Sequence, residues 1–171
     1  IEGIFNSGDL SALYKINRPE LKDAPLKVSN LAEFGSGEST FELIKRGDIL
    51  LHHPYMPYSI VTDFIREAAN DPDVLALKMC LYRTGAESPI APLLIEASES
   101  GKQVTVLIEI KARFDEENNI EWARRLEESG VHVVYGILGL KTHCKTTLVI
   151  RREGEELRRY VHIATGNYNP E

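Results

Sequence analysis

Apolar residues recur along most of this chain with the spacing of alternating strands and helices. Residues 74–81 and 103–110 are nearly continuous apolar runs, which are typical of strands covered on both faces of a sheet. Residues 131–135 form a shorter run of the same kind, and residues 48–53 are predicted as a short strand that precedes the others. The pattern therefore predicts a sheet whose strands are separated by helical segments.

Three amphipathic helices are predicted between these strands. Ser59, Ser88 and Asp115 stand where each helix would begin, and such side chains can accept hydrogen bonds from the first N–H groups of a helix. The third helix is predicted to end at Glu128 and to face inward with Ile120, Ala123 and Leu126. Alternation of strands and helices with short links implies parallel strands joined by right-handed crossovers.

The two ends of the chain depart from this alternation. Residues 142–152 and 157–164 are two β-prone runs around a glycine-containing turn, so they are predicted to form an antiparallel hairpin. Residues 1–47 hold two short helical segments and loop-forming residues, which are typical of a linker and of the tail of a preceding domain. The predicted fold class is α/β, with a mainly parallel sheet flanked by helices and an antiparallel hairpin at its edge.

Composition narrows the class of protein. A chain of 171 residues with 43% hydrophobic and 27% charged residues suits one soluble domain with a core of its own. The net charge of −6 disfavours a general nucleic-acid binder, although basic residues can still cluster locally. Two cysteines are too few for a disulfide framework, and no apolar run has membrane-spanning length. We therefore expect an intracellular protein.

His143 and Lys145 are the first candidates for chemistry. They stand two residues apart at the start of a predicted strand, where residues i and i+2 share a face. A neutral imidazole can attack an electrophile, and a neighbouring ammonium can hold an anion and disfavour the imidazolium form. The pair suits phosphoryl transfer, while the alternative is a solvated strand face without a function.

Basic residues also follow the predicted parallel strands. Arg83 follows the first strand, Lys111 and Arg113 follow the second, and Lys141 lies in the loop after the third. The carboxyl ends of parallel strands meet at one edge of a sheet, where ligands bind, and arginine binds phosphate oxygens in bidentate fashion. The alternative is that the arginines form ordinary ion pairs with the acidic residues 115–117.

Several motifs, taken in order, resemble those of the polyphosphate kinase 1 family. The motifs are His52-His53-Pro54-Tyr55, Tyr82-Arg83-Thr84-Gly85, residues 110–117, Gly139-Leu140-Lys141-Thr142-His143-Cys144-Lys145 and residues 165–170. The resemblance covers residue 48 to the end and extends to residues 13–25. It implies that residues 1–47 are the tail of a preceding domain and linker. Residues 48–171 would be the first of two C-terminal catalytic domains, truncated at its C-terminus, with a fold like half of phospholipase D.

The resemblance implies a function and a set of site residues. The family transfers the terminal phosphate of ATP reversibly to polyphosphate through a phosphohistidine, which falls on His143, with Lys145 as its catalytic partner. Arg83 and Arg113 fall on the site of magnesium and phosphate; because arginine cannot ligate a cation, we expect them to bind phosphate oxygens with Mg2+ nearby. Lys141 and Asn167 are expected to line the phosphate pocket.

The resemblance also implies partners and a location. ATP or ADP and polyphosphate are the expected ligands, together with the remaining domains of the same polypeptide, and no nucleic acid is expected. A homo-oligomer is expected for the full-length protein, in the cytoplasm or at the inner face of the membrane. The isolated chain is expected to be inactive.

Two departures bear on the alternatives. The phospholipase pattern His-x-Lys-x4-Asp requires an aspartate at position 150, where this chain has Ile150, so a phosphodiesterase is disfavoured. No second His-x-Lys follows in this chain, so the partner half of such a site is expected beyond Glu171. The remaining alternative is a module that binds polyphosphate or nucleotide without catalysis.

Overall fold

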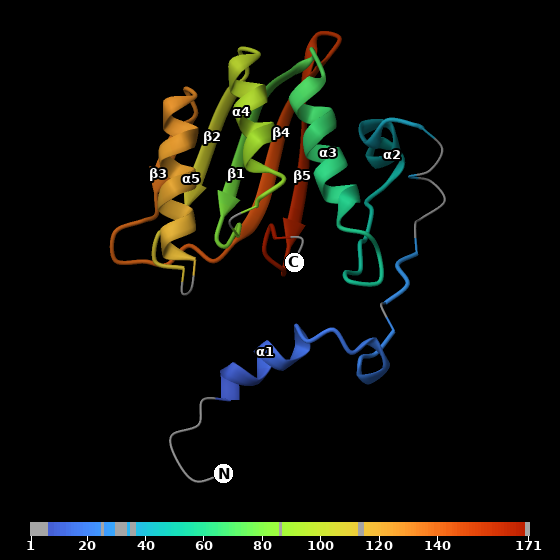
Figure 1. The fold of residues 1–171 in the computed structure, drawn as a ribbon. Helices are drawn as coiled ribbons and strands as arrows, with labels where there is room; N and C mark the ends of the chain where they lie inside the picture. The colour runs from blue at the N-terminus through green and yellow to red at the C-terminus, as the bar shows by residue number, and fades with distance from the viewer. Residues whose placement is uncertain are drawn as a thin grey trace.

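The computed structural model describes residues 7–24, 26–29, 34, 37–85, 87–112 and 115–169. A five-stranded sheet with the order β3-β2-β1-β4-β5 occupies the centre of the described part (Figure 1). Its strands are β1 (Val74–Leu81), β2 (Gln103–Ile108), β3 (His132–Tyr135), β4 (Lys145–Glu153) and β5 (Glu156–Ala164). The helices are η1 (Ser7–Leu10), α1 (Ser11–Tyr14), η2 (Pro19–Leu21), α2 (Thr40–Arg46), α3 (Ser59–Asn70), α4 (Ala91–Glu99) and α5 (Glu116–Glu128).

The pairing of the strands confirms the predicted mixed α/β sheet. β1 is parallel to β2 and β2 to β3, as expected where a helix connects each pair. β4 runs antiparallel to β1 and forms a hairpin with β5. Because of this reversal, β4 begins at the end of the sheet where β1 and β2 finish.

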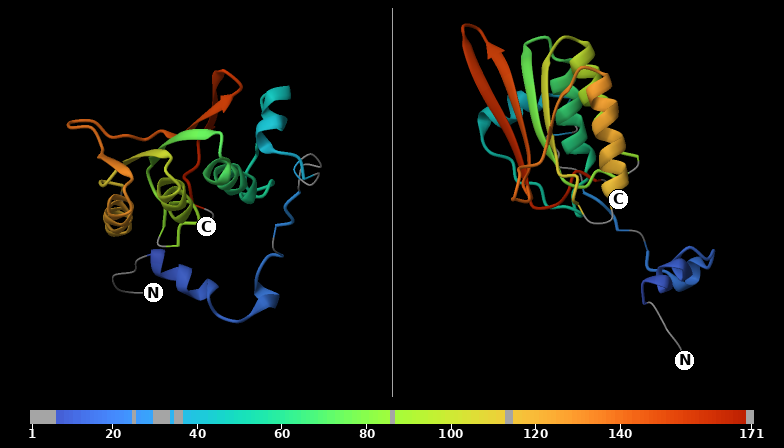
Figure 2. Two further views of the ribbon diagram at one scale, coloured as in Figure 1. Left: turned by 90° about the horizontal axis from the view of Figure 1, so that it is seen from above. Right: turned by 90° about the vertical axis from the view of Figure 1, so that its left-hand side faces the viewer.

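Helices α3, α4 and α5 cover one face of the sheet (Figures 1 and 2). The core lies between them and the strands, and its fully buried side chains include Ile65, Leu77, Leu94, Val106, Leu126 and Val149. Strand side chains alternate between the two faces, so the opposite face carries the other set, in which Val161 is 51% and Ile163 78% exposed. No helix in the described ranges is long and apolar enough to cross a bilayer.

The strand predicted at residues 48–53 is wrong. These residues adopt no strand conformation, and Leu50 is 86% exposed. A strand needs a hydrogen-bonded neighbour, and here the backbone turns back on itself instead: the N–H of Met56 donates to the carbonyl of His52 at 2.9 Å.

The inward stripe predicted for α5 is partly wrong. Ala123 and Leu126 are buried as expected, but Ile120 is 54% exposed. The buried positions are instead Asn119, Trp122, Ala123 and Leu126, which share one helical face. Asn119 takes the inward position because its amide completes a polar network at the ends of β1 and β2, described below.

The N-terminal segment lies away from the sheet (Figures 1 and 2). Leu13 and Tyr14 of α1 are exposed, whereas Phe41 of α2 is only 1% exposed and packs into the core. Ser39 caps α2 through its hydroxyl, which accepts from the N–H of Phe41 at 3.2 Å. The boundary predicted at residue 48 stays a prediction; by packing, α2 belongs with the sheet.

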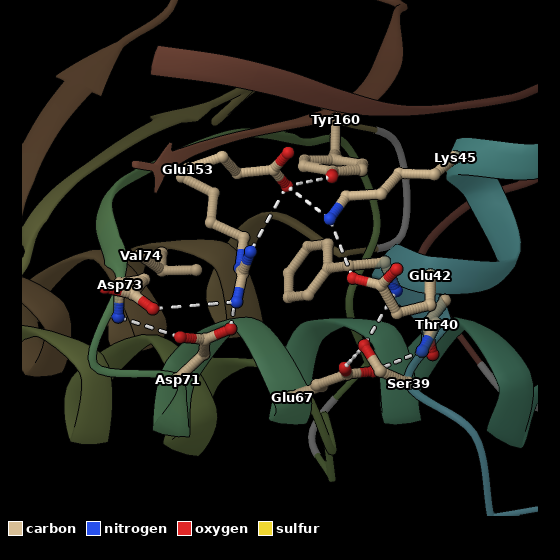
Figure 3. A network of polar contacts seen from close by, with 12 residues as sticks. Ser39, Thr40, Glu42, Lys45, Glu67, Asp71, Asp73, Val74, Glu153 and Tyr160 are labelled. Atoms are coloured by element: carbon tan, nitrogen blue, oxygen red, sulfur yellow. Dashed lines mark hydrogen bonds and ion pairs between the residues drawn. The ribbon is translucent and has the colours of Figure 1, made fainter. Parts of the chain in front are cut away.

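An ionic network ties α2 and α3 to the β4–β5 hairpin (Figure 3). Glu153 accepts from Tyr160 and lies 3.1 Å from Lys45 and 3.2 Å from Arg151, which also bonds Asp71 at 2.8 Å. Burial alone would raise the pKa of Glu153, but hydrogen bonds from Tyr160, Lys45 and Arg151 outweigh it and lower the pKa to about 2. The network lies at the end of β4 opposite Lys145.

Candidate active site

The predicted site residues gather where β1 and β2 end and β4 begins. Arg83 follows β1, Lys111 follows β2, and Lys145 opens β4. The pairing of Cys80 with Thr146 sets the end of β1 beside the start of β4. The antiparallel strand therefore delivers its first residues to the same edge at which the parallel strands finish.

His143 and Lys145 are in direct contact. Lys145 Nζ lies 3.0 Å from His143 Nε2 and donates to the backbone carbonyl of His143 at 2.7 Å. His143 is exposed and precedes the strand, whereas Lys145 is only 3% exposed. Because the ammonium can only donate, we assign the Nε2 lone pair as the acceptor, which places the ring proton on Nδ1.

The environment of Lys145 disfavours its charge. Desolvation lowers the pKa of the Lys145 ammonium, and the nearby Arg83 guanidinium lowers it further. A cation that is partly stripped of water and lies beside a second cation is a strong binder of anions, because an anion restores the lost stabilisation. The pair thus places an imidazole nitrogen beside a cation suited to binding an anion.

Tyr82 stands at the centre of this cluster, and the sequence reasoning assigned it no role. The ring is only 6% exposed and lies edge-to-face with the imidazole of His143, with 4.6 Å between centroids. Three cations approach the ring: Lys145 Nζ at 4.7 Å, Arg83 Cζ at 5.4 Å and Lys141 Nζ at 5.7 Å from its centroid. The signal in the sequence that could have identified Tyr82 is an aromatic residue directly before an arginine at the end of a strand.

The other predicted phosphate-binding residues are distributed as follows. Arg83 is half-buried and Lys141 is exposed, and both meet the ring of Tyr82. Arg113 lies outside the described residues. The structure therefore brings His143, Lys145, Arg83 and Lys141 together.

Asn119 joins the ends of β1 and β2. Its amide nitrogen donates to the carbonyls of Tyr82 at 2.7 Å and Glu109 at 3.0 Å, and its amide oxygen accepts from Thr84 Oγ1 at 3.1 Å. Asn119 is fully buried, so these bonds are made away from water. Through them α5 holds Tyr82 against the end of β2.

Asp115 organises the loop that follows β1 and does not cap α5. Its Oδ2 accepts from the N–H groups of Thr84 at 2.8 Å and Gly85 at 3.0 Å, and its Oδ1 accepts from Asn118 at 2.7 Å. No side-chain cap bond to the helix backbone is made, which corrects the prediction. A charged acceptor for two neighbouring amides fixes the backbone on the C-terminal side of Arg83.

The caps predicted for the two other helices fare differently. Ser59 lies inside the first turn of α3, behind Tyr58, so the predicted cap is wrong. Ser88 lies three residues ahead of Ala91, the first residue of α4, and its hydroxyl accepts from the N–H groups of Ile90 at 3.3 Å and Ala91 at 3.4 Å. Ser88 therefore does stabilise the start of its helix.

Glu109 holds the loop that carries His143. The side chain is 5% exposed, and its Oε2 accepts from the N–H of Thr142 at 2.8 Å while its Oε1 accepts from the N–H of Lys111 at 3.1 Å. The bond to Thr142 is one residue from His143. Glu109 is the one charged residue in the apolar run 103–110. A lone carboxylate in such a run was a signal of a special role, and the strand prediction did not use it.

Asn167 lies in the turn after β5, close to the loop after β1. Asn169 approaches Gly85 so closely that a Cβ there would lie 3.5 Å from the amide, and Gly85 has a φ of +70°, which favours glycine. Tyr168 anchors the turn through its hydroxyl, which is 2.8 Å from Thr147 Oγ1. The Oδ1 of Asn167 is buried without a hydrogen-bond partner in the described part of the chain. Because an amide oxygen only accepts hydrogen bonds, a phosphate oxygen would have to bind the Nδ2 group of Asn167.

A resident metal ion does not fit this donor set. Among the described residues, no three His, Cys, Asp or Glu side chains are placed to hold a metal ion. The carboxylates of Glu109 and Asp115 accept from backbone N–H groups, and the remaining polar groups at this edge are mainly cations. Such a site is suited to phosphate oxygens.

Comparison with known proteins agrees with the motifs. The family model described as polyphosphate kinase C-terminal domain 1 matches residues 39–171. A polyphosphate kinase of Mycolicibacterium gilvum is 55% identical over 174 residues, covering 99% of this chain and 24% of that protein. A polyphosphate kinase 1 of Chlorobaculum tepidum is 55% identical over 170 residues, again covering 99% of this chain and 24% of that protein.

A solved structure extends the comparison to three dimensions. The crystal structure of polyphosphate kinase from Porphyromonas gingivalis superposes with a TM-score of 0.75 at 37% identity. The match covers 94% of this chain and 27% of the crystallised one. The chain therefore spans about a quarter of the length of these relatives.

Proposed function

This chain belongs to the polyphosphate kinase family, and on that premise we propose that it supplies the phosphohistidine part of an ATP:polyphosphate phosphotransferase. The observation that carries the proposal is the contact between His143 Nε2 and Lys145 Nζ at 3.0 Å, inside a cluster of cations. It pairs a nitrogen nucleophile with the charge that an incoming phosphoryl group needs.

In the first step His143 Nε2 attacks the terminal phosphorus of ATP. Its lone pair forms the N–P bond, and the P–O bond breaks with its electrons moving to the leaving oxygen of ADP. Before the substrate binds, Lys145 Nζ donates to the Nε2 lone pair of His143. When ATP binds, Lys145 gives up this bond and donates to a phosphoryl oxygen instead. In the second step a terminal oxygen of polyphosphate attacks the phosphorus, and the N–P bond breaks with its electrons returning to Nε2. The transfer is reversible because a phosphoramidate and a phosphoanhydride have comparable transfer potential.

The cations stabilise charge on the moving phosphoryl group. In phosphoryl transfer a protein contributes mainly by positioning and by electrostatic stabilisation. Arg83, Lys141 and Lys145 surround one ring within the site, and Arg113 and Asn167 complete the proposed phosphate-binding set. Mg2+ enters with the nucleotide as part of the substrate and is held by phosphate oxygens.

The wider setting is also part of the proposal. ATP or ADP and polyphosphate are the substrates, and the remainder of the polypeptide completes the site, since relatives are about four times as long. The full-length protein is a homo-oligomer. It is located in the cytoplasm, and the alternative location is the periphery of the inner membrane face. The chain on its own is inactive.

A phospholipase-like phosphodiesterase is the less favoured function. Position 150, where that pattern has an aspartate, holds Ile150 in the middle of β4, paired with Ala76 and Arg159. Ile150 lies five positions after Lys145, which is an odd number. Because side chains alternate along a strand, the two side chains point to opposite faces of the sheet. Ile150 is thus remote from the His143 cluster.

The test is transfer of label from γ-labelled ATP in the presence of Mg2+, using the full-length protein. We expect acid-labile, base-stable label that His143→Ala abolishes, because the phosphoramidate bond can no longer form. His132→Ala is the matched control, since His132 is exposed on β3, away from the site, and its label should equal that of the unsubstituted protein.

Three outcomes would count against the proposal. Undiminished label in His143→Ala would place the intermediate elsewhere. A full-length protein that binds polyphosphate but takes no label, and forms no polyphosphate, would make this chain a binding module. Hydrolysis of a phosphodiester substrate would instead favour the phospholipase-like activity.

A further inference from the structure

The aromatic ring of Tyr82 is surrounded by cations, which an ordinary packing role does not require. Three cations lie within 5.7 Å of its centroid, and the imidazole of His143 meets it edge-to-face at 4.6 Å. Two of the cations come from the segment 141–145, whereas Tyr82 and Arg83 come from the end of β1. The ring therefore connects both halves of the site.

Cations gathered this closely repel one another before any phosphate is bound. Lys145 is nearly inaccessible to water, and the charge of Arg83 further disfavours its own. The negative face of an aromatic ring attracts cations, and this attraction increases when the cation is desolvated. Tyr82 thus offsets part of the repulsion without introducing a carboxylate, which would compete with phosphate for the same cations.

The ring is itself held in place. The amide nitrogen of Asn119 donates to the carbonyl of Tyr82 at 2.7 Å and to that of Glu109 at 3.0 Å. The loop that carries His143 is tied to the same point, since Glu109 also binds the N–H of Thr142. Tyr82 can therefore fix the positions of exposed side chains such as Lys141 from a rigid base.

We propose that Tyr82 is a positioning residue whose ring assembles Lys145, Lys141 and Arg83 into an anion site and orients the His143 imidazole toward it. The identity of the anion, a polyphosphate chain or the terminal phosphates of a nucleotide, rests on the proposed function. The part of this role that concerns the cations holds for any phosphate chain.

Substitution by Leu would not separate this role from ordinary packing, because both predict a loss. Progressive fluorination of a phenylalanine at position 82 does separate them, since fluorine withdraws charge from the ring face while the ring keeps its shape. The experiment uses the full-length protein with Tyr82→Phe and its mono-, di- and tetrafluorinated analogues. Binding of inorganic tripolyphosphate is measured by calorimetry without nucleotide, and label transfer from ATP is measured alongside.

We expect Tyr82→Phe to bind tripolyphosphate nearly as well as the unsubstituted protein, and affinity to fall step by step with fluorine number. Two or three weakened cation–ring contacts give about a tenfold loss at tetrafluorophenylalanine. The matched control is the same series at Phe64, a core ring that no cation of the described residues approaches, where affinity should not change. Constant affinity across the series at position 82 would overturn the proposal.

The two readouts keep this inference apart from the proposed function. If affinity follows fluorination but no label forms in the unsubstituted protein, the ring has its role and the phosphotransferase assignment is wrong. If label forms normally and affinity is indifferent to fluorination, the phosphotransferase assignment stands and Tyr82 merely packs.

Discussion

Lys145 controls how the His143 cluster responds to pH. Its ammonium donates to the imidazole and is the most deeply buried cation of the cluster. Desolvation and the charge of Arg83 lower its pKa, so it loses its proton at a lower pH than an ordinary lysine. Above that pH the cluster keeps the imidazole but loses the positive charge beside it.

We expect the phosphotransfer rate of the full-length protein to decline on the alkaline side as Lys145 deprotonates. Lys145→Arg should transfer more slowly at neutral pH, because the planar guanidinium does not fit the site of an ammonium, but its decline should move to higher pH, because arginine stays charged. The measurement is single-turnover label transfer against pH. An unchanged alkaline decline in Lys145→Arg would assign that limb to another group.

At the scale of single residues, the sequence predicted which cations lie near His143 better than it predicted the contacts that hold them. The proximity of His143 and Lys145 follows from a two-residue spacing, and the place of Arg83 follows from the end of a strand. Tyr82, Glu109 and the true partners of Asp115 could not be predicted, because their roles depend on which segments meet in space. A carboxylate before a helix looks the same whether it caps that helix or binds amides 30 residues away.

Among the elements, α5 contributes to the geometry of the site through its N-terminal end. Asp115, directly before the helix, and Asn119, in its first turn, bond the ends of β1 and β2 and the loop that follows β1. This explains why Ile120, which an apolar stripe would turn inward, is exposed: the helix is rotated so that a polar side chain enters the core. Periodicity of apolar residues cannot reveal such a rotation, because it assumes that the buried face is apolar throughout.

Asn119→Ala should therefore loosen the site end of the sheet. The substitution leaves the carbonyls of Tyr82 and Glu109 without their side-chain donor, and each unsatisfied buried group costs about 1–3 kcal/mol. We expect faster amide hydrogen exchange in residues 82–85 and 109–112 of the full-length protein, measured by mass spectrometry.

The control for this prediction is Glu121→Ala, which changes an exposed residue of the same helix. It should leave exchange at the ends of β1 and β2 unchanged. If Asn119→Ala also leaves it unchanged, water replaces the amide adequately and α5 does not hold the site.

Across the whole molecule, the two ends of the sheet are organised by opposite charge patterns. At one end three cations surround the ring of Tyr82, and at the other end Glu153 and Asp71 are matched by Lys45 and Arg151 (Figure 3). The second end, where the charges are balanced, stabilises the fold, and the cations of the first end are those that we propose bind an anion. The alternation of strands and helices was predictable from the sequence, since each element is long enough to show its period. The balance of charge was not predictable, because the ion pair of Lys45 and Glu153 joins residues that are more than 100 positions apart in the sequence.

The balanced end predicts how the fold responds to acid. Glu153 keeps its charge down to a pKa of about 2, whereas in the unfolded chain a glutamate has a pKa of about 4.5, so the folded state binds fewer protons between these values. Its contribution to the free energy of unfolding is therefore complete above pH 4.5 and is lost as the pH falls toward 2. Glu153→Gln should lower stability at pH 7 by about 1.5–3 kcal/mol, the range for hydrogen bonds to charged groups, and flatten the acid dependence.

Urea unfolding of this chain, followed by the fluorescence of its one tryptophan, Trp122, measures both effects. Glu96→Gln is the matched control, because it removes one exposed carboxylate from α4, outside the network, and should keep the acid dependence of the unsubstituted chain. Glu153 contacts Lys45 and Arg151 from two different parts of the fold, so its loss should be felt by α2 and the hairpin together. An unfolding curve for Glu153→Gln that shifts at pH 7 but keeps the full acid dependence would mean that another carboxylate sets the response to acid, and that the network contributes packing but no charge stabilisation.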